Sequence, residues 1–262
     1  MIEFINYPDG TFYPQIKEFE SEITFKINSY SDLWKLRQIK DVYDANRKPL
    51  SVTIPCIIDG QADRRFNDNE SANLRLVCQF INSMKFEQVS VFHPHNPEVI
   101  EALIDNVEII DNTSFITNVL GRLIEDNKEK LKNMVLLSTD AGGFKPLMKL
   151  ADRIFWKGEV FAASKSRSWD GNASKLTQQI DKEDFEGKSI LIVDDLCVYG
   201  GTFIGLSKLL KNRNIGNLYL ATSHLTVTAP NPELSTAFDR VFITNSKYNQ
   251  YVLDNLTLIN RF

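Results

Sequence analysis

Short apolar runs, each about as long as a buried β-strand, alternate with helix-like segments along the chain. This alternation restricts the fold more than any other feature. The runs 134–138 and 189–193 are clear examples, and each leads into a segment with the apolar spacing of a helix. Parallel strands cannot be joined by tight hairpins and are usually connected through helices. The pattern therefore predicts an α/β fold with mainly parallel sheets.

The alternation passes along the chain in two successive series. The expected strands are 51–58, 89–92, 134–138, 160–163, 189–193, 218–222 and 240–244. The expected helices are 71–84, 97–103, 113–132, 144–154 and 203–211. Two series predict two similar halves with a boundary near Asn112, and hence domains at residues 1–112 and 113–262.

The composition excludes several classes of protein. With 262 residues, 43% hydrophobic and 24% charged, the chain has the composition of a globular protein. Its net charge of -4 makes duplex nucleic acid an unsuitable main partner. No apolar run approaches the ~18 residues needed to cross a bilayer, and the start lacks the layout of a signal peptide. The three cysteines have no paired spacing, so we expect a protein of the reducing cytoplasm without a disulfide or zinc site.

An acidic and glycine-rich loop follows one strand-like run. Asp194 and Asp195 stand at the expected strand end, and Gly200-Gly201-Thr202 opens the next helix. Paired carboxylates can bind vicinal hydroxyls or Mg²⁺, and consecutive glycines let backbone N–H groups approach an anion at a helix N-terminus. The structural alternative is a strand before a helix that Thr202 caps, and an apolar strand ending in Asp-Asp also resembles a Walker B element. The complete string favours a binding loop.

Two further loops carry candidate metal ligands. Asp140 follows an expected strand and precedes Gly142-Gly143, where backbone could accommodate phosphate. His93 and His95 lie two residues apart at another expected strand end. Ligands of parallel α/β sheets bind at the carboxyl ends of strands, which favours His95 as a ligand. The alternatives are a tight turn at the glycines and a purely structural role for the histidines.

Two charged segments could meet phosphate groups. Lys165 and Arg167 lie in a polar stretch, 164–172, that we expect to be a mobile loop able to close over transferring phosphates. Arg64 and Arg65, next to Asp63, can donate paired hydrogen bonds to phosphate. The alternative for the first segment is a solvated pair of surface charges. The alternative for the second segment is a charged turn whose acids cap the helix after Ser71.

Together these motifs resemble those of the ribose-phosphate pyrophosphokinase (PRPP synthetase) family, in the family's order, over about residues 54–244. Asp63-Arg64-Arg65-Phe66 with Glu70-Ser71 resembles its ATP-contacting segment, and Pro94-His95 its metal-binding loop. Residues 138–143 resemble its metal and phosphate segment. Lys165 and Arg167 match the cations of its catalytic flexible loop. Residues 194–202 match its phosphoribosyl-binding loop, and Tyr7-Pro8-Asp9-Gly10 resembles its adenine site, although Thr11 replaces a Glu.

The resemblance implies a fold, a reaction and a set of roles. The fold is two tandem type I phosphoribosyltransferase-like domains, assembled into a homo-oligomer. The reaction is the attack of a ribose 1-hydroxyl on the β-phosphorus of ATP, which yields a 1-diphosphate and AMP. Positioning and charge neutralisation carry most of such a transfer. The implied roles are Mg²⁺ binding by His95 and Asp140, ATP binding by Asp9, Asp63, Arg64 and Arg65, catalysis by Lys165 and Arg167, and sugar-phosphate binding by Asp194, Asp195, Val198, Tyr199, Gly200, Gly201 and Thr202.

The centre of the sugar loop departs from the family pattern. The family has Asp-Thr directly before Gly-Gly-Thr, whereas this chain has Val198-Tyr199. The change removes polar partners of a terminal 5-phosphate and adds an aromatic wall. A longer 5-substituent, such as the ADP portion of ADP-ribose, would suit that wall. The acceptor is therefore predicted to be ADP-ribose, as in NAD rebuilding pathways, or ribose 5-phosphate.

Two other functions fit part of the sequence. A phosphoribosyltransferase would share the Asp194-Asp195 and Gly200-Gly201 loop but would not need Lys165, Arg167 or His95. A non-catalytic regulatory relative of PRPP synthetase would explain the lost Asp and Thr of the sugar loop. The retained Lys165 and Arg167 argue against that second alternative.

Overall fold

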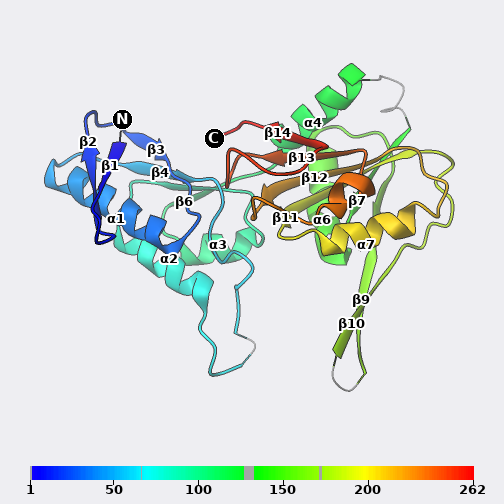
Figure 1. Ribbon diagram of the computed structural model, residues 1–262, viewed down its shortest axis with the longest axis horizontal. Helices are drawn as coiled ribbons and strands as arrows, with labels where there is room; N and C mark the ends of the chain where they lie inside the picture. The colour runs from blue at the N-terminus through cyan, green and yellow to red at the C-terminus, as the bar shows by residue number, and fades with distance from the viewer. Residues whose placement is uncertain (1, 66, 127–132, 171–172) are drawn as a thin grey trace. The chain divides into compact units, whose positions relative to one another are not determined.

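A computed structural model describes residues 2–65, 67–126, 133–170 and 173–262, and the side chains of 126, 165–170 and 173–177 lie outside that description. The chain divides into two compact units (Figure 1). The first comprises Met1–Asp111 with Phe262, and the second comprises Asn112–Arg261. Each unit is an α/β structure built on its own parallel sheet, which confirms the predicted fold class.

The first unit contains a four-stranded parallel sheet in the order β3-β4-β5-β6. An antiparallel ribbon, β1-β2, precedes it in the chain. The strands are β1 (Ile2–Asn6), β2 (Phe12–Ile16), β3 (Glu22–Thr24), β4 (Ser51–Ile54), β5 (Val89–Phe92) and β6 (Val107–Ile110). The helices are α1 (Tyr30–Ala45), α2 (Asn73–Ser83) and α3 (Pro97–Leu103).

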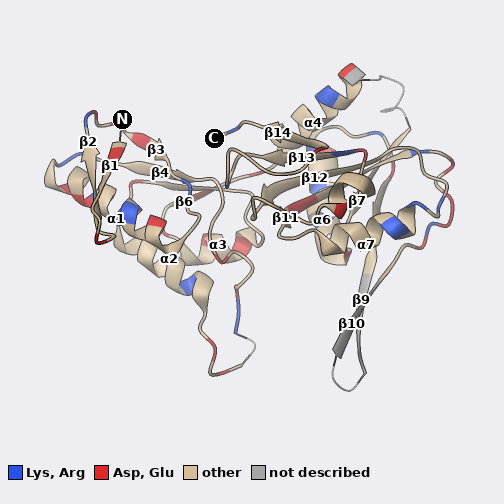
Figure 2. Cartoon of the chain, viewed as in Figure 1, with Lys and Arg blue, Asp and Glu red and all other residues tan. Residues whose placement is uncertain are grey.

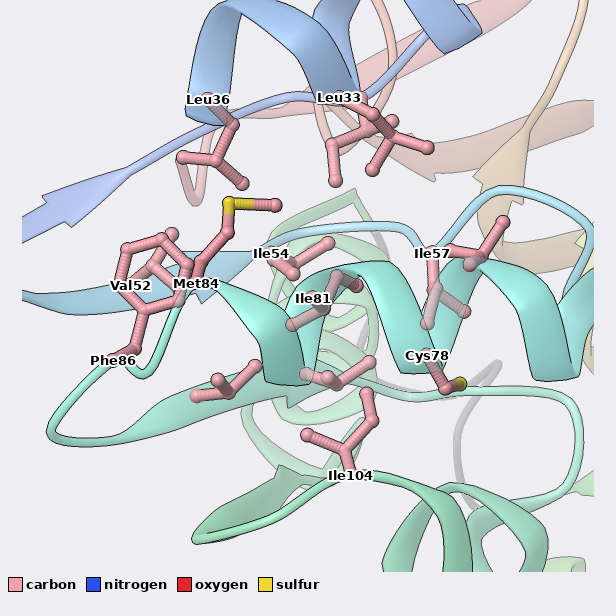
Figure 3. Close-up of a cluster of buried hydrophobic side chains, with 14 of the residues drawn as sticks. Leu33, Leu36, Val52, Ile54, Ile57, Cys78, Ile81, Met84, Phe86 and Ile104 are labelled. Atoms are coloured by element: carbon pink, nitrogen blue, oxygen red, sulfur yellow. The ribbon is translucent and has the colours of Figure 1, made fainter. Parts of the chain in front are cut away.

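The core of this unit forms where α1 and α2 pack on the sheet. Leu33 and Leu36 of α1 meet Val52 and Ile54 of β4, and Ile81 of α2 completes the layer (Figure 3). All five are buried. Each buried aliphatic side chain contributes about 1.5–3 kcal/mol relative to exposure, so this layer stabilises the unit.

The second unit contains a six-stranded sheet, all parallel, in the order β14-β13-β12-β11-β7-β8. Its strands are β7 (Met134–Ser138), β8 (Val160–Ala162), β11 (Ser189–Cys197), β12 (Leu218–Leu225), β13 (Arg240–Thr244) and β14 (Leu256–Ile259). Its helices are α4 (Thr113–Asp126), α6 (Ala141–Arg153), α7 (Gly201–Leu210) and α8 (Glu233–Ala237). An antiparallel ribbon of β9 (Ser164–Asp170) and β10 (Ala173–Gln179) projects from this unit (Figure 1).

The central strands of this sheet are buried along their apolar runs. Every residue of β7 and β12 is buried, as are the first five of β11. Strands covered on both faces have continuous rather than alternating apolar sequences, which is why these runs are visible in the sequence. In the described parts of the chain, none of the helices combines the length and apolar character that a bilayer-spanning segment needs.

Three sequence expectations are corrected. The stretch 164–172, expected as a loop, contains the strand β9 (164–170), which pairs with β10 (173–179). The periodicity missed this ribbon because a ribbon outside a larger sheet needs no apolar face. The strand expected over 189–193 continues to Cys197, so Asp194 and Asp195 lie inside β11. The helix α7 begins at Gly201, with Gly200 rather than Thr202 as its N-cap.

Candidate active site

The acidic pair of β11 lies beside the end of β7. Those two strands are neighbours in the sheet, with Ile192 opposite Leu137. The hydroxyl Oγ1 of Thr139 donates a 2.8 Å hydrogen bond to Oδ2 of Asp194. The backbone N–H of Asp195 donates to Oδ1 of Asp194 at 2.9 Å. The structure thus joins two sequence motifs that lie 55 residues apart. Figure 2 shows acidic residues, drawn in red, at β11. The sequence motif around Asp140 predicted no role for Thr139.

The carboxyl group of Asp194 has an unusual protonation equilibrium. Its burial and the adjacent charge of Asp195 raise the pKa of Asp194 to about 8, against an ordinary value of 3.8. The bonds from Thr139 and the Asp195 N–H favour the charged form but do not outweigh burial. Burial and the neighbouring acid therefore shift Asp194 toward its protonated form in the ligand-free protein. Perturbed carboxyl groups of this kind are typical of functional sites.

This shift predicts a pH dependence of stability. Because the folded-state pKa of Asp194 is raised, its stabilising contribution is complete below pH 3.8 and is lost as the pH rises through about 8. In Mg²⁺-free buffer, the wild-type free energy of unfolding should fall from pH 5 to pH 9 more steeply than that of Asp194→Asn. Denaturant unfolding at a series of pH values measures the difference. Parallel curves would mean that Asp194 ionises normally.

Asp140 terminates the loop after β7 and begins α6. Its Oδ1 accepts a 3.1 Å hydrogen bond from the Gly143 N–H, so Asp140 is the N-cap of α6. Its Oδ2 accepts no hydrogen bond from the described residues. A Cβ added to Gly142 would lie 3.2 Å from Oδ1 of Asp140, so the glycine leaves room for this cap. Asp140 can cap the helix with one oxygen and offer the other to a ligand.

The glycine turn before α7 has a left-handed backbone. Gly200 has φ +98°, and a Cβ at this position would lie 2.7 Å from the Leu234 side chain of α8. No side chain caps α7, and no acid lies in its first turn. The N–H groups of the first helical turn therefore have no capping side chain, which suits an anion.

Val198 and Tyr199 line the outside of this turn. Val198 is 48% exposed and Tyr199 is 58% exposed. The Tyr199 carbonyl accepts a 3.1 Å hydrogen bond from the Asn231 N–H, so the backbone is held while the ring faces solvent. An ordered backbone with an exposed ring can present an aromatic surface to a ligand.

In the first unit, Asp63 connects the arginine segment to the histidine loop. Arg64 donates to Asp63 through Nε at 2.8 Å and through Nη2 at 2.9 Å, and Asn96 donates to Oδ2 of Asp63 at 3.2 Å. Arg64, and also Asn96 and nearby His95, lower the pKa of Asp63 to about 2. Asp63 is thus a permanent anion that positions its neighbours. Asn96, the N-cap of α3, was not identified from the sequence.

A pocket of about 630 Å³ opens beside this ion pair. Its wall carries three arginines, of which Arg64 and Arg65 were expected and Arg75 was not. The apolar side is formed by Ala72, Val99, Ala102 and Leu103, and the remaining lining residues are Asp63 and Glu98. Ala72 is the N-cap of α2 and makes no side-chain cap, which does not support the alternative in which acids of this turn cap the helix. Three guanidinium groups beside an apolar wall can bind a nucleotide polyphosphate.

The other expected residues lie elsewhere. His95 is exposed in the loop before α3, and Asp9 lies in the turn between β1 and β2. Oδ1 of Asp9 accepts hydrogen bonds from the Thr11 N–H at 3.0 Å and hydroxyl at 2.7 Å. Neither His95 nor Asp9 lines the pocket. Lys165 and Arg167 belong to β9, and their side chains lie outside the described part of the structure.

A metal ion bound here would need water and substrate oxygens as ligands in addition to protein side chains. Within the described ranges, no group of three or more His, Cys, Asp and Glu side chains gathers around one point. The free Oδ2 of Asp140 is the kind of oxygen that Mg²⁺ prefers. Mg²⁺ usually keeps several waters and completes its shell with substrate phosphates, so a sparse protein site suits it.

The fold and this site correspond to a recognisable class of protein. The family model described as "Phosphoribosyl transferase domain" matches residues 106–251, more than half of the chain. The chain therefore belongs to the phosphoribosyl transferase domain family.

Its relatives within that class are ribose-phosphate pyrophosphokinases. The one from Saccharolobus solfataricus is 22% identical over 226 residues, which cover 84% of this chain and 74% of the relative. The one from Thermococcus kodakarensis is 22% identical over 251 residues, covering 94% and 85%. Phosphoribosylpyrophosphate synthetase from Mycobacterium smegmatis shares the fold, with a TM-score of 0.78 at 18% identity over 99% of this chain and 86% of that one. Within the phosphoribosyl transferase domain family, the chain is thus similar at low identity to ribose-phosphate pyrophosphokinases over most of its length.

Proposed function

We propose that the protein transfers the β,γ-diphosphoryl group of ATP to the 1-hydroxyl of a 5-phosphorylated ribose. The observation that carries this proposal is the strand edge where Asp194, next to Asp195 in β11, accepts a hydrogen bond from Thr139, the residue directly before the metal candidate Asp140. Vicinal hydroxyls and a metal-bound polyphosphate are the partners that such an edge can bind. The relatives named ribose-phosphate pyrophosphokinase support the same reaction.

The reaction exchanges one phosphorus–oxygen bond for another. The ribose 1-hydroxyl oxygen attacks the β-phosphorus, and the bond from that phosphorus to the oxygen bridging the α-phosphate breaks. AMP leaves with the bridging oxygen, and the hydroxyl proton is released. We assign the ribose 2- and 3-hydroxyls to Asp194 and Asp195, and the 5-phosphate to Gly200-Gly201-Thr202. His95 and Asp140 are our candidate ligands for Mg²⁺, which would neutralise phosphate charge, and Lys165 with Arg167 would stabilise the diphosphoryl group in transfer.

We assign the ATP polyphosphate to the arginine pocket of the first unit. Arg64 is 67% exposed although its guanidinium is paired with Asp63, so its remaining donors face outward. Arg65 and Arg75 extend the cationic wall, and the apolar side could pack on a base. Asp9 remains a candidate for adenine binding from a neighbouring subunit, within the homo-oligomer that the family resemblance implies. The cytoplasmic location predicted from the cysteine pattern remains part of this proposal. Sedimentation velocity would test the assembly.

Arg75→Ala tests this assignment. Losing one charged donor to phosphate should raise the KM for ATP about tenfold, because such a bond is worth about 1.5–3 kcal/mol. The KM for the sugar should not change. Steady-state kinetics with Arg122→Ala as the control compares an exposed arginine of α4 that does not line the pocket. Equal ATP affinity in both variants would exclude the pocket.

We further propose ADP-ribose as the acceptor, ahead of ribose 5-phosphate. Val198 and Tyr199 offer a terminal phosphate no side-chain donor except one exposed phenol, while the Tyr199 ring can stack on a base or pack on a second ribose. A coupled assay of AMP release with ATP, Mg²⁺ and each acceptor measures the preference. Strong preference for ribose 5-phosphate would refute the acceptor assignment but not the reaction. Product formation from a ribose 1-diphosphate without ATP would instead favour a phosphoribosyltransferase.

Restoring the family residues should reverse the preference. Val198→Asp with Tyr199→Thr removes the aromatic wall and returns polar partners for a terminal phosphate. The ratio of kcat/KM for ADP-ribose to that for ribose 5-phosphate should fall at least about tenfold, because stacking and one hydrogen bond together exceed about 1.4 kcal/mol. Tyr199→Phe is the matched control and should keep the wild-type ratio. An unchanged ratio in the double variant would show that the loop does not select the acceptor.

A further inference from the structure

The ribbon β9-β10 packs against α7 through one glutamine and one glycine. Gln178 lies in β10 and Gly205 lies within α7, and the two elements are in contact. A Cβ built on Gly205 would lie 2.6 Å from Oε1 of Gln178, closer than any ordinary contact. Only a glycine at position 205 therefore leaves room for the Gln178 side chain in its present position.

The choice of residues at this contact is unfavourable in other respects. Glycine in a helix interior is less favourable than alanine, so Gly205 weakens α7. The Nε2 atom of Gln178 is buried and has no hydrogen-bond partner among the residues that the structure describes. The glutamine is therefore held by close packing rather than by its amide donor. Two such unfavourable choices at one contact indicate that the contact itself has a role.

The position of the contact suggests what that role is. In the ribbon, Gln178 is the direct cross-strand partner of Lys165, one step from the base where Ser164 pairs with Gln179. On the helix side of the contact, α7 begins at Gly201, directly after the Gly200 turn. The contact thus links the strand that carries Lys165 to the helix that follows the sugar loop.

We infer that Gln178 is a positioning residue whose side chain, seated against Gly205, fixes the base of the ribbon on α7 and so sets the backbone at Lys165 relative to the sugar loop. This inference rests on the proposed function, because it gives Lys165 and the Gly200 turn their roles in diphosphoryl transfer. Displacing a catalytic group by about 1 Å can cost on the order of 10²-fold in rate. Ground-state binding of the sugar would be much less affected.

Gly205→Ala is the first test. The new methyl group displaces the Gln178 side chain, and kcat should fall at least about tenfold, with the KM for the acceptor changed less than about twofold. Gly121→Ala in α4 is the matched control, because a Cβ there meets nothing within 4 Å. Both substitutions replace a helical glycine by a better helix former, so neither should lower the unfolding temperature. Wild-type kcat in Gly205→Ala would overturn the inference.

Variants of Gln178 test whether its side chain acts through packing rather than through its amide group. Gln178→Ala should lower kcat like Gly205→Ala, and Gln178→Met, of similar length but without the amide, should restore it. In the double variant Gly205→Ala/Gln178→Ala the methyl group enters the emptied space, so the two effects should not add. Full additivity, or a Met variant as slow as the Ala variant, would contradict an anchor that works by packing.

A measurement independent of activity keeps this inference distinct from the proposed function. Amide hydrogen exchange of residues 164–170 and 173–179 should accelerate in Gly205→Ala and in Gln178→Ala, and not in Gly121→Ala. If the wild type transfers no diphosphoryl group but exchange changes in this way, the proposed function fails while the anchor stands. If the wild type is active and exchange does not change, the anchor fails alone.

Discussion

Lys165→Ala should lower kcat for AMP release by about 10³-fold while the KM for each substrate changes little. Phosphoryl-type transfer depends on charge stabilisation in the transition state, and removing one preorganised donor typically costs about 10²–10³-fold. Lys165 lies on β9, next to the base of the ribbon, where its backbone is fixed by pairing with Gln178. The measurement is single-turnover and steady-state AMP release with saturating ATP, Mg²⁺ and acceptor.

The control for this variant is Lys157→Ala, which removes an exposed lysine between α6 and β8. It should retain wild-type kcat. Full activity in Lys165→Ala would remove the catalytic assignment of the ribbon. A wild-type protein that releases no AMP with either acceptor would favour the regulatory alternative, because a non-catalytic relative could keep Lys165 without using it.

The sequence was most informative about the buried parallel strands. The runs at β5, β7 and β13 were predicted with their observed bounds, because strands covered on both faces are continuously apolar. The helix α3 was also predicted with its bounds, since Pro97 stands at its first position. These elements can be predicted from a few consecutive residues.

The sequence analysis missed the antiparallel ribbons, the edge strands β3, β6 and β14 of the parallel sheets, and the helices α1 and α8. The ribbons β1-β2 and β9-β10 have no continuous apolar run, so periodicity could not find them. The helix α1 was missed although the capping box of Ser29 and Asp32 marks its start. That signal was present in the sequence and would have located the helix.

The sequence predicted which residues belong to the candidate site but not which of them contact one another. The acids and glycines could be read along the chain, whereas the bond from Thr139 to Asp194 depends on β7 and β11 being neighbours in a particular register. The bond from Asn96 to Asp63 likewise joins segments 33 residues apart. Arg75 was overlooked because a helical arginine has no motif, and only the pocket identifies it. Long-range pairing decides which polar residues meet, and local patterns do not contain it.

Gly200→Ala should lower the free energy of unfolding of the second unit by about 2–5 kcal/mol. Left-handed backbone costs a residue with a Cβ about 1–2 kcal/mol, and overpacking a buried contact costs about 1–3 kcal/mol. Both apply here, because Gly200 has φ +98° and its Cβ would lie 2.7 Å from buried Leu234. Relaxing either strain shifts the turn that precedes α7, so affinity for a 5-phosphorylated ribose should fall as well.

Gly201→Ala separates these two consequences. It lies one residue further on, where a Cβ meets nothing within 4 Å and the backbone is helical. Its stability should change by less than about 1 kcal/mol, as at ordinary surface sites. Urea unfolding would measure the free energy of unfolding of both variants. Hydrogen exchange of β11 and α7 would measure their local stability. If Gly200→Ala were as stable as Gly201→Ala, the left-handed turn would not be needed for folding. If Gly201→Ala folds normally yet binds the sugar phosphate more weakly, the glycine pair serves the ligand, and only Gly200 also serves the fold.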